Sequence, residues 1–131
     1  MIGIDTNVLV RFLTQDDPSQ SAAATRLLLD AEAKRMKVRV NLHVLLETVR
    51  VLRSTYGHSS TTVLEIVERL VESPPLEVEA PALVRKALAQ ARESGHELPD
   101  VLIGILNRDC QTTWTFDSKA AKLPGFTLLK G

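Results

Sequence analysis

Short runs of β-branched and apolar residues alternate along the whole chain with longer segments whose apolar residues recur at helical spacing. Strands separated by helices favour parallel pairing, because a parallel neighbour is reached only through a crossover connection, usually a helix. The pattern therefore predicts an α/β domain of three layers, with helices on both faces of a mostly parallel central sheet. The expected strands are 2–4, 38–40, 76–78, 112–116 and 126–129, and the expected helices begin near residues 8, 18, 42, 63, 81 and 99.

Length and composition indicate one domain. A chain of 131 residues of which 44% are hydrophobic can bury one substantial core, and we expect residues 1–131 to form a single domain. The residues after Met1 lack the features of a signal peptide, and no segment approaches the roughly 20 apolar residues of a membrane span. We therefore expect a cytoplasmic protein that does not bind membranes.

Charge and cysteine content narrow the classes of function. The 16 basic and 16 acidic residues give no net charge, so no overall positive field favours nucleic acid. Metal ions held by carboxylates can present positive charge locally, so this balance leaves an RNA partner open. The single cysteine, Cys110, excludes an internal disulfide and a multi-cysteine metal site.

Two aspartates follow predicted strands. Asp5 ends the first strand, and Asp117 follows the strand-like segment 113–116. Ligands of open parallel sheets bind at the carboxyl ends of strands, which makes both residues candidates for a site. An aspartate in this position is also a common turn former or helix cap, so each residue alone has two interpretations.

Two further acids interrupt apolar helical segments. Glu47 lies within Val44–Val49, and Asp100 opens the apolar segment that follows Pro99. A buried carboxylate must be paired, protonated or directed into a cleft. The alternatives are a salt bridge from Glu47 to Arg50 or Arg53, and a favourable position for Asp100 in a first helical turn. These alternatives are less plausible for four acids together than for any one.

Four acids gathered at the strand ends would form a magnesium site, because Mg²⁺ prefers oxygen ligands. Their mutual repulsion would raise their pKa values until a cation binds. A bound metal lowers the pKa of water and stabilises a phosphoryl transition state. The four acids therefore point to phosphodiester hydrolysis.

Read together, these segments resemble the PIN-domain family, and in particular its VapC-type toxin ribonucleases. The resemblance extends over nearly the whole chain, in the order and spacing of its segments. The segments are Ile4–Arg11, Leu13–Pro18, Leu45–Arg53, Leu98–Ile103, Thr115–Asp117 and Leu123–Phe126. One departure precedes Asp100, where relatives often carry Asp-Phe-Xaa-Asp and this chain has Glu97-Leu98-Pro99-Asp100.

The resemblance implies a five-stranded parallel sheet between helices and a pocket lined by the four acids. By this likeness Asp5 and Asp100 are direct Mg²⁺ ligands, with Mn²⁺ as an alternative ion. Glu47 and Asp117 would bind a second metal, order water or position a ligand through water. All four acids are then catalytic candidates.

Further residues follow from the same resemblance or from the sequence near the site. Thr115 matches a supporting hydroxyl position, whereas Thr6 and Asn7 either orient Asp5 or cap a helix. Candidates for RNA contact are Arg11, Arg53, Lys119 and Lys122, for each of which a solvated surface position is the simpler interpretation.

The resemblance implies a magnesium-dependent endoribonuclease that acts as the toxin of a toxin–antitoxin pair. Its substrates would be tRNA or rRNA loops, whose cleavage inhibits translation, and its partners a VapB-like antitoxin and a second copy of the chain in a homodimer. One alternative is a catalytically inactive PIN-like binding module. Another is a phosphatase that uses Asp5 as an aspartyl nucleophile, although the sequence pattern of such phosphatases has a second acid two residues later, where this chain has Asn7.

Overall fold

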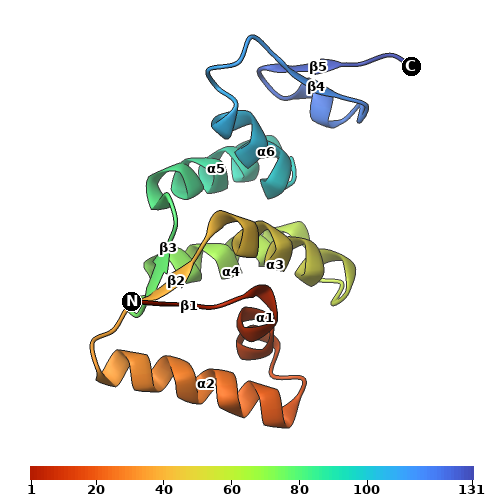
Figure 1. Cartoon of the computed structure of the whole chain (residues 1–131). Helices are drawn as coiled ribbons and strands as arrows, with labels where there is room; N and C mark the ends of the chain where they lie inside the picture. Colours follow the sequence, from red (N-terminus) through yellow and green to blue (C-terminus); the bar gives the residue numbers. More distant parts are fainter. The chain divides into compact units, whose positions relative to one another are not determined.

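The computed structural model describes residues 1–131 as two compact units, Met1–Pro81 and Ala82–Gly131 (Figure 1). The first unit contains β1 (Ile2–Gly3), α1 (Thr6–Thr14), α2 (Pro18–Ala33), β2 (Val38–Val40), α3 (Leu42–Ser54), α4 (Ser60–Glu72) and β3 (Leu76–Val78). From the boundary onward lie α5 (Pro81–Ser94), α6 (Leu98–Leu106), β4 (Thr113–Thr115), the 3-10 helix η1 (Ala120–Lys122) and β5 (Phe126–Leu128). The α/β class with parallel sheets is confirmed.

The sheet of the first unit has three parallel strands in the order β1-β2-β3. In its register Ile2 pairs with Val38, and Val38 pairs with Leu76. Each connection runs through two helices, as expected for parallel neighbours. The carboxyl end of β1 leads directly into α1, so the turn that joins them lies at the edge of the sheet where parallel folds bind ligands.

The second unit contains the other two strands. β4 and β5 form a parallel pair in which Thr113 is opposite Phe126 and Thr115 is opposite Leu128. The predicted strands are therefore present, but in a sheet of three and a sheet of two, and a single five-stranded sheet is not shown. The local pattern of residues predicts where each strand lies in the sequence. Which strands pair with one another depends on contacts between distant segments, which the local pattern does not contain.

Local sequence signals set where the helices begin. Asp17 caps α2 by accepting a hydrogen bond from Gln20 N at 3.0 Å, and Pro18 occupies the first turn, where its missing N–H costs nothing. Asn41 caps α3 in the same way, accepting from Val44 N at 2.8 Å. No helix combines the length and the apolar character needed to cross a membrane.

The core of the first unit includes buried residues of β2, α1 and α3. Val38, Val40, Leu9, Leu45 and Leu52 are all less than 2% exposed. Helix α1 packs on α2 and α3, and α4 packs on α3 and β3. This packing fixes the first turn of α1 and the middle of α3, the two segments that carry the acids of this unit.

Candidate active site

Asp5 caps the helix that follows the first strand. Its backbone is extended, and its Oδ1 accepts a hydrogen bond from Val8 N at 3.0 Å. The capping interpretation of this aspartate is therefore correct for one carboxylate oxygen. Capping occupies only Oδ1, so Oδ2 is left to bind a ligand at the carboxyl end of β1.

Glu47 lies on α3 and is held from α1. Its Oε1 accepts a short hydrogen bond from the hydroxyl of Thr6, and its Oε2 lies 4.0 Å from Nε2 of His43 one helical turn earlier. Glu47 is thus in contact with one residue of α1 and one residue of its own helix. The Glu47 side chain is 38% exposed, so it is accessible to a ligand although one of its oxygens is fixed.

Asp5 and Glu47 share a cavity, which we call the acidic cavity. It has a volume of about 400 Å³. Its lining includes Asp5, Thr6, Asn7, His43, Glu47 and Arg50. Two carboxylates from distant segments thus open into one space, with a hydroxyl and an imidazole beside them.

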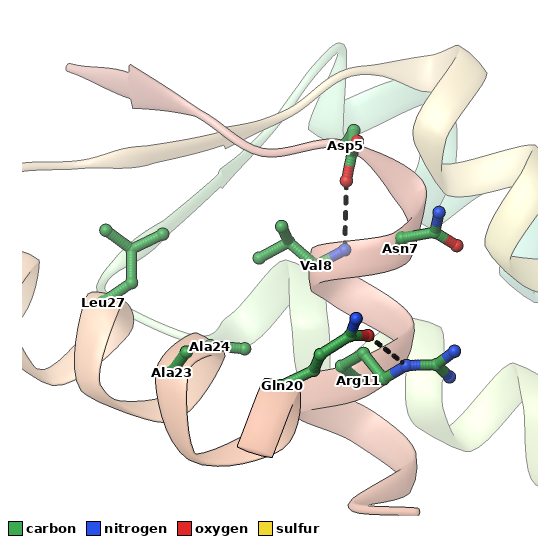
Figure 2. A pocket seen from close by; sticks show the side chains of 8 residues that line it. All are labelled: Asp5, Asn7, Val8, Arg11, Gln20, Ala23, Ala24 and Leu27. Atoms are coloured by element: carbon green, nitrogen blue, oxygen red, sulfur yellow. Dashed lines mark hydrogen bonds between the residues drawn. The ribbon is translucent and has the colours of Figure 1, made fainter. Parts of the chain in front are cut away.

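A second cavity lies next to the same turn, between α1 and α2, and we call it the α1–α2 cavity. Its volume is about 330 Å³. Figure 2 shows the side chains that line it, from Asp5 and Asn7 to Arg11, Gln20 and Leu27. Because Asp5 and Asn7 line both cavities, the turn between β1 and α1 forms part of the wall of each.

In the second unit, Asp100 occupies the first turn of α6. Partial burial, and then the negative charges of Asp117 and Glu97, raise the pKa of Asp100 above its usual value, against smaller opposing effects of His96 and Lys119. Like charges therefore converge on Asp100, and Asp117 is one of them. A nearby cation would relieve this repulsion.

Asp117 follows β4 and organises the next turn. Its backbone N donates to Thr115 Oγ1 at 3.0 Å, and its Oδ1 accepts from the backbone N of Lys119 at 2.8 Å and of Ala120 at 3.3 Å. As in Asp5, only the Oδ1 atom of the carboxylate accepts hydrogen bonds from neighbouring backbone N–H groups. Thr115, the supporting hydroxyl candidate, contacts the backbone of Asp117 rather than its carboxylate.

The chemistry of these residues fits a hard divalent cation. Carboxylate oxygens and a hydroxyl are the ligand types that Mg²⁺ and Mn²⁺ prefer. Within each unit the acids occur as a pair, Asp5 with Glu47 and Asp100 with Asp117. Neither unit gathers three or more His, Cys, Asp or Glu side chains into a group that could hold a metal ion. Each pair would therefore leave much of a metal's coordination shell to water and substrate phosphate.

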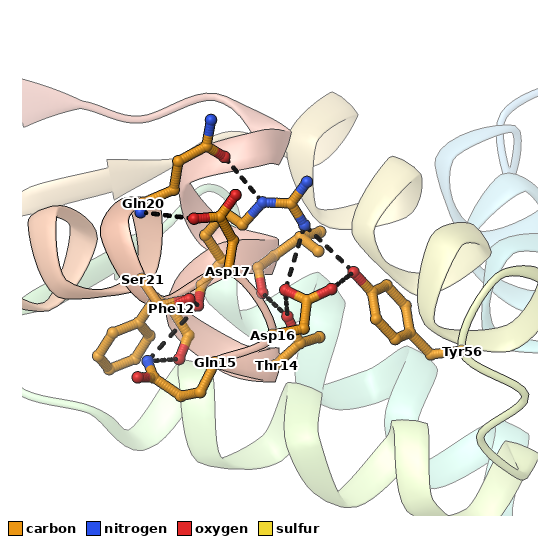
Figure 3. A network of polar contacts seen from close by, with 10 residues as sticks. Phe12, Thr14, Gln15, Asp16, Asp17, Gln20, Ser21 and Tyr56 are labelled. Atoms are coloured by element: carbon orange, nitrogen blue, oxygen red, sulfur yellow. Dashed lines mark hydrogen bonds and ion pairs between the residues drawn. The ribbon is translucent and has the colours of Figure 1, made fainter.

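A polar network surrounds the start of α2, and Figure 3 shows Asp16, Gln20 and Tyr56 within it. Arg11, a candidate for RNA contact, donates hydrogen bonds to all three of these residues. Its Nη1 donates to Asp16 Oδ1 at 3.3 Å and to the hydroxyl of Tyr56 at 3.2 Å, and its Nε donates to Gln20 Oε1 at 2.8 Å. The Tyr56 hydroxyl in turn donates to Asp16 Oδ2 at 2.6 Å. The network fixes the guanidinium beside the α1–α2 cavity.

The other basic candidates have different surroundings. Arg53 Nη1 donates to the backbone oxygen of His58 at 2.9 Å. Lys119 donates a backbone hydrogen bond to Asp117, and its positive charge acts on Asp100. Sequence reasoning did not single out Tyr56, Gln20 or the contact of His43 with Glu47. Only the i, i+4 spacing of His43 and Glu47 offered a signal, since the other contacts join distant segments.

Comparison with known protein families gave a match for this chain. The PIN domain family model matches residues 2–123. This match runs through both compact units and includes all four acids. A comparison with curated proteins gave no match.

Proposed function

This chain belongs to the PIN domain family, and from that premise we propose that it is a magnesium-dependent endoribonuclease. PIN domains are generally metal-dependent nucleases, which supports a hydrolase acting on phosphodiesters. The observation that carries the proposal is the acidic cavity, where Asp5 and Glu47 open into one space. The proposal treats residues 1–131 as one PIN domain with the family's five-stranded sheet, supported by a match that covers both units.

In this proposal Asp5 and Asp100 bind Mg²⁺, or Mn²⁺ in its place. When bound, the cation supplies positive charge beside the scissile phosphate and makes water more acidic. Asp5 is suited to this role because its capping bond uses only Oδ1. Asp100 is suited because, besides the burial that chiefly raises its pKa, the negative charges of Asp117 and Glu97 also raise it and favour a cation nearby.

Glu47 and Asp117 bind a second metal, order water or position a ligand through water, and Glu47 can accept a proton from water. The hydroxyl of Thr6 fixes one oxygen of Glu47, which leaves Oε2 to accept a proton. Asp117 is held by the backbone of its own turn through Oδ1, and Thr115 holds the backbone of Asp117. Asn7 lines both cavities and contacts the substrate there. Thr6 and Thr115 are thus positioning residues.

The finer biological role is also part of the proposal. The family resemblance supports a toxin that cleaves tRNA or rRNA loops in the cytoplasm and thereby inhibits translation. It also supports a VapB-like antitoxin as partner and a homodimer as the assembly. Arg11, Arg53 and Lys119 are proposed to approach the RNA backbone; of these, Arg11 has its position fixed by Asp16 and Tyr56.

The test is to incubate the purified chain with total cellular RNA in Mg²⁺, in Mn²⁺ and in EDTA. Asp5→Asn and Asp100→Asn are run in parallel, and Asp109→Asn, which changes an exposed carboxylate of the second unit, is the control. We expect discrete metal-dependent fragments that either site variant reduces on the order of 100-fold or more, since even indirect metal partners contribute 10- to 100-fold. Full cleavage by a folded Asp5→Asn protein would contradict the site, and no cleavage by the wild type would favour the binding-module or phosphatase alternatives.

A further inference from the structure

The α1–α2 cavity combines an apolar wall with a few polar groups. Val8, Ala23 and Leu27 provide apolar surface, whereas Arg11 and Gln20 provide hydrogen-bonding groups (Figure 2). Its volume of about 330 Å³ lies within the usual range for small-ligand sites. The whole lining belongs to the first unit, so the cavity is complete within residues 1–81.

Arg11 determines which end of the Gln20 amide faces the cavity. Because Arg11 Nε donates to Gln20 Oε1, the amide nitrogen is turned the other way, and Figure 2 shows it on the side of Val8 and Asp5. Arg11 is itself held by Asp16 and Tyr56. The network therefore presents the two N–H donors of Gln20 in a fixed orientation above an apolar wall.

A nucleobase matches this combination of groups. Proteins that recognise single-stranded RNA splay out bases, cover their faces and hydrogen-bond to their edges. A purely hydrocarbon group would leave the Gln20 donors unpaired, which costs free energy once water is excluded. Asp5 and Asn7 line both this cavity and the acidic cavity, so an occupant of the α1–α2 cavity lies next to the turn that carries Asp5.

We propose that the α1–α2 cavity binds one unstacked base of an RNA substrate, next to the phosphate held at the acidic cavity, and that Gln20 reads an acceptor on its edge. This inference rests on the proposed ribonuclease function and adds a specificity site to it. The base stacks against Val8 and Leu27 and receives a hydrogen bond from Gln20 Nε2. Arg11 acts as a positioning residue, because its bond to Gln20 sets the orientation of the amide.

The first test fills the cavity without touching the acids. Ala23 and Ala22 are both exposed on α2, but only Ala23 lines the cavity, so Ala23→Leu is the test variant and Ala22→Leu its matched control. Leucine and alanine both favour helices, so both variants should fold. Binding of four labelled octaribonucleotides, each rich in one base, is measured by fluorescence anisotropy with Ca²⁺ in place of Mg²⁺ to slow cleavage.

We expect wild type and Ala22→Leu to bind alike and Ala23→Leu to bind its preferred RNA about tenfold or more weakly, the scale of losing one stacked base. Equal affinities of Ala23→Leu and wild type, or no binding of any of the four RNAs, would overturn the assignment. So would a protein partner that binds wild type but not Ala23→Leu while RNA binding is unchanged. If wild type binds RNA, and Ala23→Leu binds it more weakly, but no Mg²⁺-dependent cleavage occurs, the nuclease function is contradicted while the base-binding site is still supported.

The second test addresses the amide of Gln20. Gln20→Glu keeps an acceptor for Arg11 but removes the N–H donors, and Ser19→Glu adds the same charge at a neighbouring exposed position that does not line the cavity. We expect Gln20→Glu to change the ranking of the four RNAs, whereas Ser19→Glu weakens all four equally. An unchanged ranking in Gln20→Glu would show that Gln20 does not read the base.

Discussion

The hydroxyl of Thr6, in the first turn of α1, donates a hydrogen bond to Oε1 of Glu47 in the middle of α3. The two residues are 41 positions apart, so this bond joins the carboxyl end of the first strand to the helix that follows the second. It fixes the carboxylate that we propose as a proton acceptor.

Replacing Thr6 by valine removes this bond and keeps the shape of the side chain. We expect Thr6→Val to lower kcat for RNA cleavage by about tenfold with a smaller change in KM, and to lower the free energy of unfolding by about 1 kcal/mol, a typical value for one hydrogen bond. Thr6→Ser restores the hydroxyl and should recover most of kcat. Equal kcat values in wild type and Thr6→Val would show that the bond is structural only.

Asp100 destabilises the metal-free fold when it is charged. Because burial and Asp117 raise the pKa of Asp100 above 3.8, the folded protein binds this proton more tightly than the unfolded chain does. This destabilisation is absent below pH 3.8 and grows as the pH rises from there through the pKa that Asp100 has in the folded protein.

Asp100→Asn should therefore have a higher Tm than wild type at pH 7 in EDTA, and this gain should shrink as the pH falls towards 3.8. Added Mg²⁺ should raise the Tm of wild type more than that of Asp100→Asn, because the variant loses a proposed ligand. Asp109→Asn serves as the control. A Tm of Asp100→Asn that is lower than wild type in EDTA would contradict the repulsion.

The Arg11 network has the opposite pH dependence. Hydrogen bonds from Tyr56 and Thr14, assisted by the charge of Arg11, lower the pKa of Asp16 below 3.8. The stabilisation is complete above pH 3.8 and is lost as the pH falls through the lower folded pKa. We expect Tyr56→Phe to lower Tm at pH 7 and this difference to narrow in acid. Asp30→Asn, an exposed change, should show neither effect, and a pH-independent loss in Tyr56→Phe would assign the effect to packing.

Two buried hydroxyls of the first unit differ in their partners. Thr48, beside Glu47 on α3, is 1% exposed and its Oγ1 has no hydrogen-bond partner, whereas Ser21 is 2% exposed and donates to the backbone oxygen of Arg11 at 2.8 Å. We expect Thr48→Val to raise the free energy of unfolding by about 1 kcal/mol and Ser21→Ala to lower it by a similar amount. Urea titration measures both, and destabilisation by Thr48→Val would indicate a polar partner inside the fold.

The sequence predicted features that depend on neighbouring residues. Asp17 and Pro18 marked the start of α2, and the alternation of Val38, Arg39 and Val40 predicted β2 with the bounds it has. Helix capping and the alternation of buried and exposed residues depend on only a few neighbouring residues, so the local sequence is enough to predict where these elements lie. The 3-10 helix at Ala120–Lys122 was not predicted, since one short turn has no periodicity.

Features that depend on distant contacts could not be predicted in the same way. The acids were identified as candidates, but the hydrogen bond that Glu47 accepts from Thr6, 41 positions away, was not predicted. Arg11 was a candidate for RNA contact, and its bonds to Gln20 and Tyr56 became visible only with the fold. The strand runs were recognised, whereas their division into sheets of three and two was not.

The turn from Asp5 to Asn7 lines both cavities, whereas Gln20, Ala23 and Leu27 of α2 line only one of them. If the two proposals hold, a substitution in the turn is expected to alter hydrolysis and recognition together. Changes on the cavity side of α2 are then expected to alter recognition alone. Under these proposals, duplicated copies of such a gene could diverge in the RNA they select through drift in a single helix, while every copy keeps the same hydrolytic chemistry.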